Sequence, residues 1–239
     1  MSIAGEMEVL KDLGAVSARA AELIGDRIRG CTAPFRLALS GGTTPRGCYR
    51  HLAHLHQVPW DCVEIYLGDE RFVPHNHPES NYGMIRDLLL SGASVNPRAV
   101  FAIPDDGEAE SAAQTYEEIL RQQYGSSHLL PHLPLFDLQL LGLGEDGHTA
   151  SLLPGQPVLE ERSRWVAVVP DGRPEPRITL TYPALESSRL MVFLVCGAAK
   201  KDALARARAG DRTIPAGRLK PRGDVIWLVD RAAAGIDAD

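Results

Sequence analysis

Short apolar runs that each end in a glycine-rich or charged segment recur along this chain, and they constrain its fold more than any other feature. The run at residues 35–39 leads into Ser-Gly-Gly-Thr-Thr-Pro, where Pro45 suits the first position of a helix. Strands are predicted at residues 35–39, 63–67, 100–103, 136–141, 165–169, 190–195 and 225–229. Helices are predicted at residues 9–29, from 45 onward, at 108–123 and at 198–209.

Alternating strands and helices favour an α/β fold, because right-handed crossovers place parallel strands side by side and helices on both faces. The run Leu-Met-Val-Phe-Leu-Val at 190–195 suits a strand that is buried on both faces. We therefore expect a three-layer, Rossmann-like α/β fold with a mostly parallel sheet. Since the 239 residues contain no internal repeat and no linker-like stretch, one domain is expected over 1–239.

Composition narrows the classes of function. A net charge of −6 disfavours a broad nucleic-acid or membrane-binding surface, since such surfaces need clustered positive charge. No apolar run approaches the ~20 residues that span a bilayer. The four cysteines form no C-x-x-C, and the N-terminus lacks a signal-peptide pattern. These features predict a cytoplasmic protein with a small-molecule partner, either monomeric or a weak homo-oligomer.

Four of the predicted strands end in unusual segments, at residues 40–44, 69–71, 146–148 and 197–200. Ligands of open α/β sheets bind beyond the carboxyl ends of the strands. The 40–44 segment offers backbone N–H groups, hydroxyls and a helix N-terminus, which suit an anion such as phosphate. Lys200 also points to an anion, because the first turn of a helix ordinarily prefers an acid. The alternative to an anion site is structural in each case: a tight turn with a helix cap for the 40–44 segment, and a solvated surface lysine for Lys200.

Residues 142–148 read Gly-Leu-Gly-Glu-Asp-Gly-His and match the G-x-G-x-x-G spacing of dinucleotide-binding loops. However, Glu145 and Asp146 would repel a pyrophosphate, and the match lies in mid-chain rather than after the first strand. We interpret the glycines as bending the backbone so that Asp146 can orient His148, since an imidazole suits proton transfer near neutral pH. The alternative is a histidine that only caps the next helix.

Other chemistries find less support. The chain has neither a G-x-S-x-G nor an H-E-x-x-H motif. His75 and His77 follow Asp69 and Glu70, but their proline-bounded loop offers no clear third and fourth ligand. We therefore expect no metal.

Five segments in order resemble the glucosamine-6-phosphate isomerase/6-phosphogluconolactonase family, and within it the lactonases. They are LSGGTTP at 39–45, GDERFVP and HPESNY within 68–82, GLGEDGHTAS at 142–151, RITLT at 177–181 and GAAK at 197–200. The resemblance implies hydrolysis of 6-phospho-D-glucono-1,5-lactone to 6-phospho-D-gluconate, the second step of the oxidative pentose phosphate pathway. It also implies that neither a metal nor an organic cofactor takes part.

Carried over to matching positions, the resemblance implies a role for each segment. His148 is the expected general base that activates water, and Asp146 is expected to orient it. Arg71 and Asn81 are expected beside the sugar ring, where Arg71 would stabilise the developing oxyanion. The residues expected to hold the phosphate are Ser40, Gly41, Gly42, Thr43, Thr44, Arg177 and Lys200.

Three alternatives remain open on sequence. The related deaminase/isomerases typically carry D-E-Y after the second strand and a glutamate five residues after the loop histidine. This chain has Asp69-Glu70-Arg71 and Leu153 there, and an apolar side chain cannot relay a proton. The lactonase is therefore preferred, and Asp69 is expected to be structural or to tune Arg71. A non-catalytic sugar-phosphate sensor would not need the Asp146–His148 pair, and an NAD-dependent enzyme would need a dinucleotide in the 142–148 loop.

Overall fold

The residues described by a computed structural model, 3, 5–31, 34–92 and 95–236, form two sheets of unequal size. The larger sheet has seven strands in the order β1-β10-β9-β6-β2-β3-β5, and all of its neighbours are parallel. Its strands are β1 (Glu6–Leu10), β2 (Phe35–Leu39), β3 (Val63–Leu67), β5 (Ala99–Phe101), β6 (Leu138–Gly142), β9 (Leu190–Val195) and β10 (Asp224–Asp230). The predicted α/β fold is confirmed.

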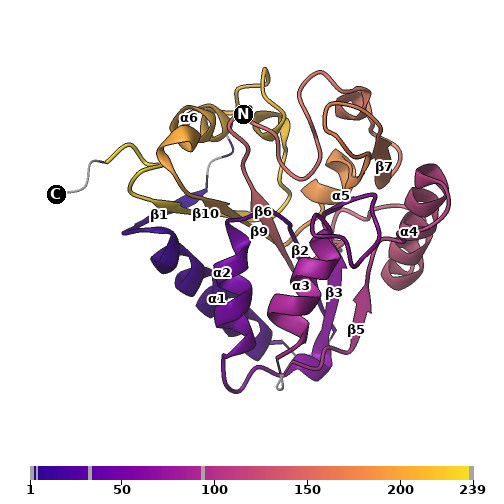
Figure 1. Ribbon diagram of the computed structural model, residues 1–239, viewed down its shortest axis with the longest axis horizontal. Coiled ribbons are helices and arrows are strands. Elements are labelled where there is room, and N and C mark those ends of the chain that lie inside the picture. The colour runs from indigo at the N-terminus through magenta and orange to yellow at the C-terminus, as the bar shows by residue number, and fades with distance from the viewer. Residues whose placement is uncertain (1–2, 4, 32–33, 93–94, 237–239) are drawn as a thin grey trace.

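Helices cover both faces of the larger sheet (Figure 1). On one face lie α1 (Leu13–Arg29), α2 (Pro45–Ala53) and α3 (Asn81–Ile85), and on the other α5 (Tyr182–Glu186) and α6 (Lys201–Ala209). Apolar side chains fill the space between the layers. As a result, β3 and β9 are buried along their whole length. None of the described helices combines the length and the apolar content that a membrane crossing requires.

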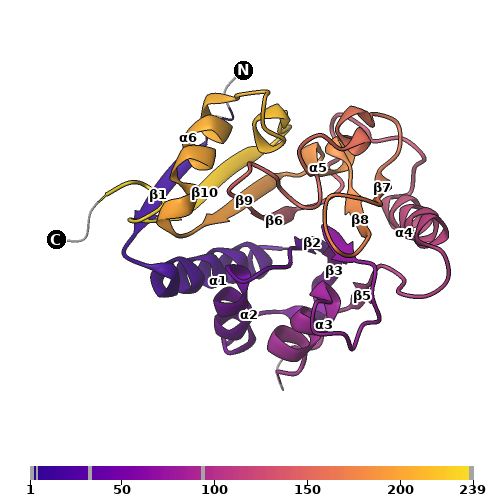
Figure 2. The same cartoon turned by 45° about the horizontal axis from the view of Figure 1, so that its top comes forward.

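A smaller antiparallel sheet, which the sequence did not predict, is present in addition to the parallel sheet. It consists of β4 (Asp69–Arg71), β8 (Arg177–Leu180) and β7 (Val166–Val169). The strand predicted at 165–169 belongs to this sheet and not to the parallel one. α4 (Ala109–Tyr124) packs against β7 and β8, at the end of the molecule away from β1 (Figure 2). A strand pattern does not say which sheet the strand joins, since partner choice depends on tertiary contacts.

The N-terminal segment departs from the prediction. The helix predicted over 9–29 begins only at Leu13, and the residues before it form β1 alongside β10. Asp12 caps the helix, with its carboxylate accepting from the Ala15 N–H at 2.9 Å. β1 is an edge strand in which Met7 and Val9 are each 37% exposed. Its weak hydrophobic pattern does not distinguish it from the helix that follows.

β2 and β6 are neighbours at the centre of the sheet, and the chain leaves them in opposite directions. From β2 it proceeds to β3 and β5, and from β6 to β9 and β10. Their register joins only Leu37 with Leu138 and Ala38 with Gln139, so their carboxyl ends are free to separate. Such a switch point creates a crevice in which ligands of open α/β sheets bind.

Candidate active site

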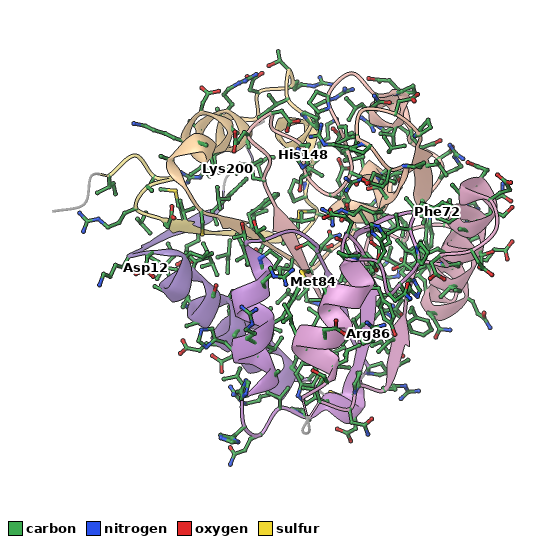
Figure 3. The ribbon with its side chains drawn as sticks, in the orientation of Figure 1. Asp12, Phe72, Met84, Arg86, His148 and Lys200 are labelled. Carbon is green, nitrogen blue, oxygen red and sulfur yellow. The ribbon has the colours of Figure 1, made fainter. Side chains whose placement is uncertain are left out.

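A cleft of about 350 Å³ lies at this switch point, beyond the carboxyl ends of β2, β3, β6 and β9. His148 and Lys200 lie on the side of the sheet that carries α6 (Figure 3). The predicted site residues that line the cleft are Ser40, Gly41, Gly42, Thr43, Thr44, Arg71, Asn81, His148, Arg177 and Lys200. Asp146 is not part of the lining but contacts His148. The fold therefore brings together residues from five separate segments.

The 40–44 loop joins β2 to the N-terminus of α2. Tyr49 of α2 fastens it, because its hydroxyl donates to the Ser40 carbonyl at 2.5 Å and accepts from the Ser40 N–H at 3.1 Å. Burial raises the pKa of Tyr49, so this phenol stays protonated. The Ser40 Oγ is buried at the cleft without a hydrogen-bond partner among the described residues. A ligand oxygen would supply that partner.

The buried carboxylate of Glu70 holds β4 and α3 together. It accepts from the backbone N–H groups of Arg71 at 2.8 Å, Asn81 at 2.6 Å and Tyr82 at 2.8 Å, and from the Ser80 hydroxyl at 3.1 Å. Burial raises the pKa of Glu70, against the effect of these N–H donors. The sequence assigns Glu70 no role, yet its contacts fix the positions of both Arg71 and Asn81.

Asn81 lies against the 40–44 loop. Its Nδ2 donates to the Asp69 carbonyl at 2.9 Å, whereas its buried Oδ1 has no hydrogen-bond partner among the described residues. A Cβ on Gly41 would lie 1.8 Å from this Oδ1, so only glycine fits there. The Asp69 carboxylate accepts from the Ser151 hydroxyl at 2.6 Å.

The 142–148 loop closes on itself. Gly144 N–H donates to the His148 carbonyl at 2.8 Å, and Gly147 N–H donates to the Gly144 carbonyl at 3.0 Å. The His148 Nδ1 lies 2.5 Å from the Asp146 Oδ1, and Nε2 has no hydrogen-bond partner among the described residues. A Cβ on Gly144 would lie 2.0 Å from Nδ1, so this glycine makes room for the ring. Residues 149–156, all of them described, begin no α-helix, so His148 caps none.

Arg173 completes this arrangement, although no sequence motif singled it out. It lies in the loop between β7 and β8, and its Nη2 donates to the Asp146 Oδ2 at 2.9 Å. Burial acts to raise the pKa of Asp146. The hydrogen bonds and charge of His148, followed by the contact with Arg173, outweigh burial and lower that pKa to about 2. Asp146 is therefore ionised throughout the ordinary pH range.

Two further cations face the cleft. Lys200 Nζ lies 3.7 Å from the Glu145 Oε1, and Arg177 Nη2 lies 3.9 Å from the Glu175 Oε2. Burial, followed by the charge of Arg71, lowers the pKa of Arg177. The buried Arg177 Nε has no hydrogen-bond partner among the described residues. An anion between the arginines would relieve their repulsion and supply the missing acceptor.

The two histidines considered as metal ligands have other contacts. The His75 Nε2 lies 2.9 Å from the Ile103 carbonyl and its ring packs on Tyr82, while the His77 Nδ1 accepts from the Glu79 N–H at 3.2 Å. Within the described ranges, no three His, Cys, Asp or Glu side chains gather as metal ligands. The contacts of both histidines shape the loop between β4 and α3.

The likeness to known proteins extends over most of the chain. The family model described as glucosamine-6-phosphate isomerases/6-phosphogluconolactonase matches residues 11–227. The chain is 38% identical to a 6-phosphogluconolactonase of Nostoc sp., over 95% of this chain and 96% of that protein. It is 36% identical to the Homo sapiens 6-phosphogluconolactonase, over 96% and 93%. The solved 6-phosphogluconolactonase from Trypanosoma cruzi is similar with a TM-score of 0.84 at 29% identity, covering 98% of this chain and 97% of that one.

Proposed function

This chain belongs to the glucosamine-6-phosphate isomerase/6-phosphogluconolactonase family, and we propose that its cleft hydrolyses 6-phospho-D-glucono-1,5-lactone to 6-phospho-D-gluconate. The activity is that of a 6-phosphogluconolactonase, a hydrolase of the pentose phosphate pathway. The observation that carries the proposal is the Asp146–His148 pair at a cleft that also presents Arg71, Arg177 and Lys200. A base beside several cations suits an anionic ester substrate.

Water activation is assigned to His148. Because Nδ1 faces Asp146, Nε2 is free to take a proton from water as the water oxygen attacks the lactone carbonyl carbon. The resulting oxyanion is assigned to the Arg71 guanidinium, which lines the same cleft. The bond between this carbon and the ring oxygen then breaks. The ring oxygen receives the proton from His148 and becomes a hydroxyl, while Asp146 balances the transient imidazolium charge.

The phosphate group is assigned to the 40–44 loop, Arg177 and Lys200. The loop leads into the positive end of α2, and the two side chains add full positive charges. Asn81 is assigned to a sugar hydroxyl, because its Oδ1, which has no hydrogen-bond partner among the described residues, is an acceptor at the wall of the cleft. These contacts orient the lactone without forming or breaking bonds.

The position five residues after His148 argues against deamination. Leu153 is 4% exposed and packs near Gly172, so no carboxylate stands there to open a sugar ring. An assay that couples lactone hydrolysis to 6-phosphogluconate dehydrogenase tests the proposal, beside a glucosamine-6-phosphate deaminase assay on the same preparation. We expect hydrolysis well above the spontaneous rate, no ammonia release and no binding of NAD. Deamination without lactone hydrolysis, or phosphosugar binding without turnover, would overturn the proposal.

The remaining expectations from the sequence are carried forward as proposals. One domain over 1–239 is supported by the cleft, whose lining comes from both sheets. A cytoplasmic location and a monomeric or weakly associated state are proposed with it, and light scattering after size-exclusion chromatography tests the latter. The mechanism relies on side chains of this chain alone, so hydrolysis should survive dialysis against EDTA.

A further inference from the structure

We propose that Arg173 is a positioning residue that acts on the base through Asp146, holding the carboxylate in place and keeping the imidazole of His148 unprotonated. The inference rests on the proposed function, in which Nε2 must accept a proton from water. Arg173 Nη2 donates to the Asp146 Oδ2 at 2.9 Å and lies 3.5 Å from the His148 Nδ1. One guanidinium therefore contacts both members of the pair.

The two carboxylate oxygens of Asp146 contact different residues. Oδ1 faces the His148 ring at 2.5 Å and accepts from the His148 N–H at 3.1 Å, whereas Oδ2 receives the Arg173 guanidinium. Asp146 is part-exposed, so a carboxylate held on one oxygen alone would be free to turn. Arg173 is itself held by a second bond, from Nη1 to the Gly172 carbonyl at 3.0 Å. The contact thus fixes the plane of the carboxylate and the ring that it orients.

The charge of Arg173 and the charge of Asp146 have opposite effects on the protonation of the His148 ring. A carboxylate beside an imidazole favours the protonated ring, and a base that already holds a proton cannot activate water. A guanidinium 3.5 Å from Nδ1 disfavours the protonated ring. Other charged groups of the cleft are Glu145 on the same loop, Asp69 and Arg71 on β4, Arg177 on β8 and Lys200 before α6. Among the described residues, Arg173 is the arginine or lysine that contacts Asp146 directly.

Arg173 also differs from the other arginines in its position. Arg71 and Arg177 line the cleft, whereas Arg173 is outside the lining and reaches Asp146 from the β7–β8 loop. Gly172, the residue before Arg173, adopts a φ of +90°, and this positive φ sets the direction in which the chain enters Arg173. A residue with this placement acts on the reaction through Asp146 and not by contact with the substrate.

The test compares Arg173→Gln with Arg173→Lys, which keeps the charge, and with Arg164→Gln as a control. Arg164 is 46% exposed and pairs with Glu110 and Glu161, away from the cleft. We expect the acid limb of the kcat/KM profile of R173Q, corrected for spontaneous hydrolysis, to move upward by about half to one pH unit. That shift lowers kcat/KM roughly three- to tenfold near pH 6 and little near pH 8. R173K should recover most of the limb, R164Q should match the wild type, and 0.5 M KCl should shrink the shift because salt screens exposed charges.

A loss of equal size at every pH would make Arg173 merely structural and overturn the inference. A raised KM without a shift of the limb would instead make it a substrate contact, with the same consequence. NMR titration of the His148 ring provides a readout independent of turnover, and its midpoint should rise in R173Q. An unchanged midpoint in R173Q overturns the inference even if the wild type is an active lactonase. A midpoint that rises in R173Q, together with a wild type that lacks lactonase activity, overturns only the proposed function.

Discussion

Two glycine-rich loops leave neighbouring strands at the centre of the sheet and differ in what they offer a ligand. The 40–44 loop after β2 runs directly into the N-terminus of α2, whereas the 142–148 loop after β6 folds back on its own backbone. The first is suited to an anion, and the second presents Asp146 and His148. Glycine spacing alone therefore does not identify a ligand. The side chains between the glycines and the element that follows them decide it.

The largest expected effect comes from the base. We expect His148→Asn to lower kcat about 10²–10⁴-fold, toward the spontaneous rate, because the side chain that takes the proton from water is lost. Binding of 6-phosphogluconate, measured by calorimetry, should stay near the wild-type value since the phosphate loop is untouched. Turnover near that of the wild type would show that the 142–148 loop does not hold the base.

A smaller effect is expected from the glycine that makes room for the ring. In Gly144→Ala the new Cβ would lie 2.0 Å from the His148 Nδ1, so the ring must move. We expect kcat to fall roughly ten- to a hundredfold, because a displacement of about 1 Å at a catalytic group has that cost. Gly41→Ala is the matched change in the other loop, where the Cβ would lie 1.8 Å from the Asn81 Oδ1. It should mainly raise KM, and the same change of kcat in both variants would remove the distinction between the loops.

The sequence predicts these two loops well because their signals are local. Each loop follows a buried strand directly and carries its glycines within a few residues, the 40–44 loop also precedes a helix start, and parallel strands bring such segments to one edge. The long-range contacts had no comparable signal. β4 (DER) and β8 (RITL) contain charged and polar residues in place of an apolar run, and β1 depends on β10, which lies more than 200 residues further along the chain. Arg173 meets Asp146 only through the β7–β8 loop, in a sheet that the sequence did not predict.

A substitution of Lys200 tests the role of the phosphate-binding residues. We expect Lys200→Ala to raise KM about tenfold with kcat changed less than about threefold, since a contact made equally in the ground and transition states affects binding alone. Steady-state kinetics in the coupled assay separates the two parameters. A fall in kcat at unchanged KM would move Lys200 from the phosphate to the reacting carbonyl.

The smallest expected effect concerns the ion pair that links the loops. Glu145 belongs to the 142–148 loop, and its Oε1 lies 3.7 Å from the Lys200 Nζ. A substrate phosphate must compete with this carboxylate for the lysine, so Glu145→Gln should lower KM about twofold, the size expected of an exposed pair. The difference should vanish in 0.5 M KCl. A raised KM would mean that Glu145 itself contacts the substrate.

The parallel pairing of β1 with β10 has a consequence for how the protein is made. Glu6 pairs with Ile226, so the edge of the sheet remains unformed until nearly the whole chain has been synthesised. The strands that carry the cleft, β2, β3, β6 and β9, all precede β10 along the chain. Until β10 is synthesised, β1 has no strand to pair with, and the edge of β9 that β10 later occupies stays open. We therefore expect the catalytic centre to assemble first during translation, and the two ends of the described chain to meet last.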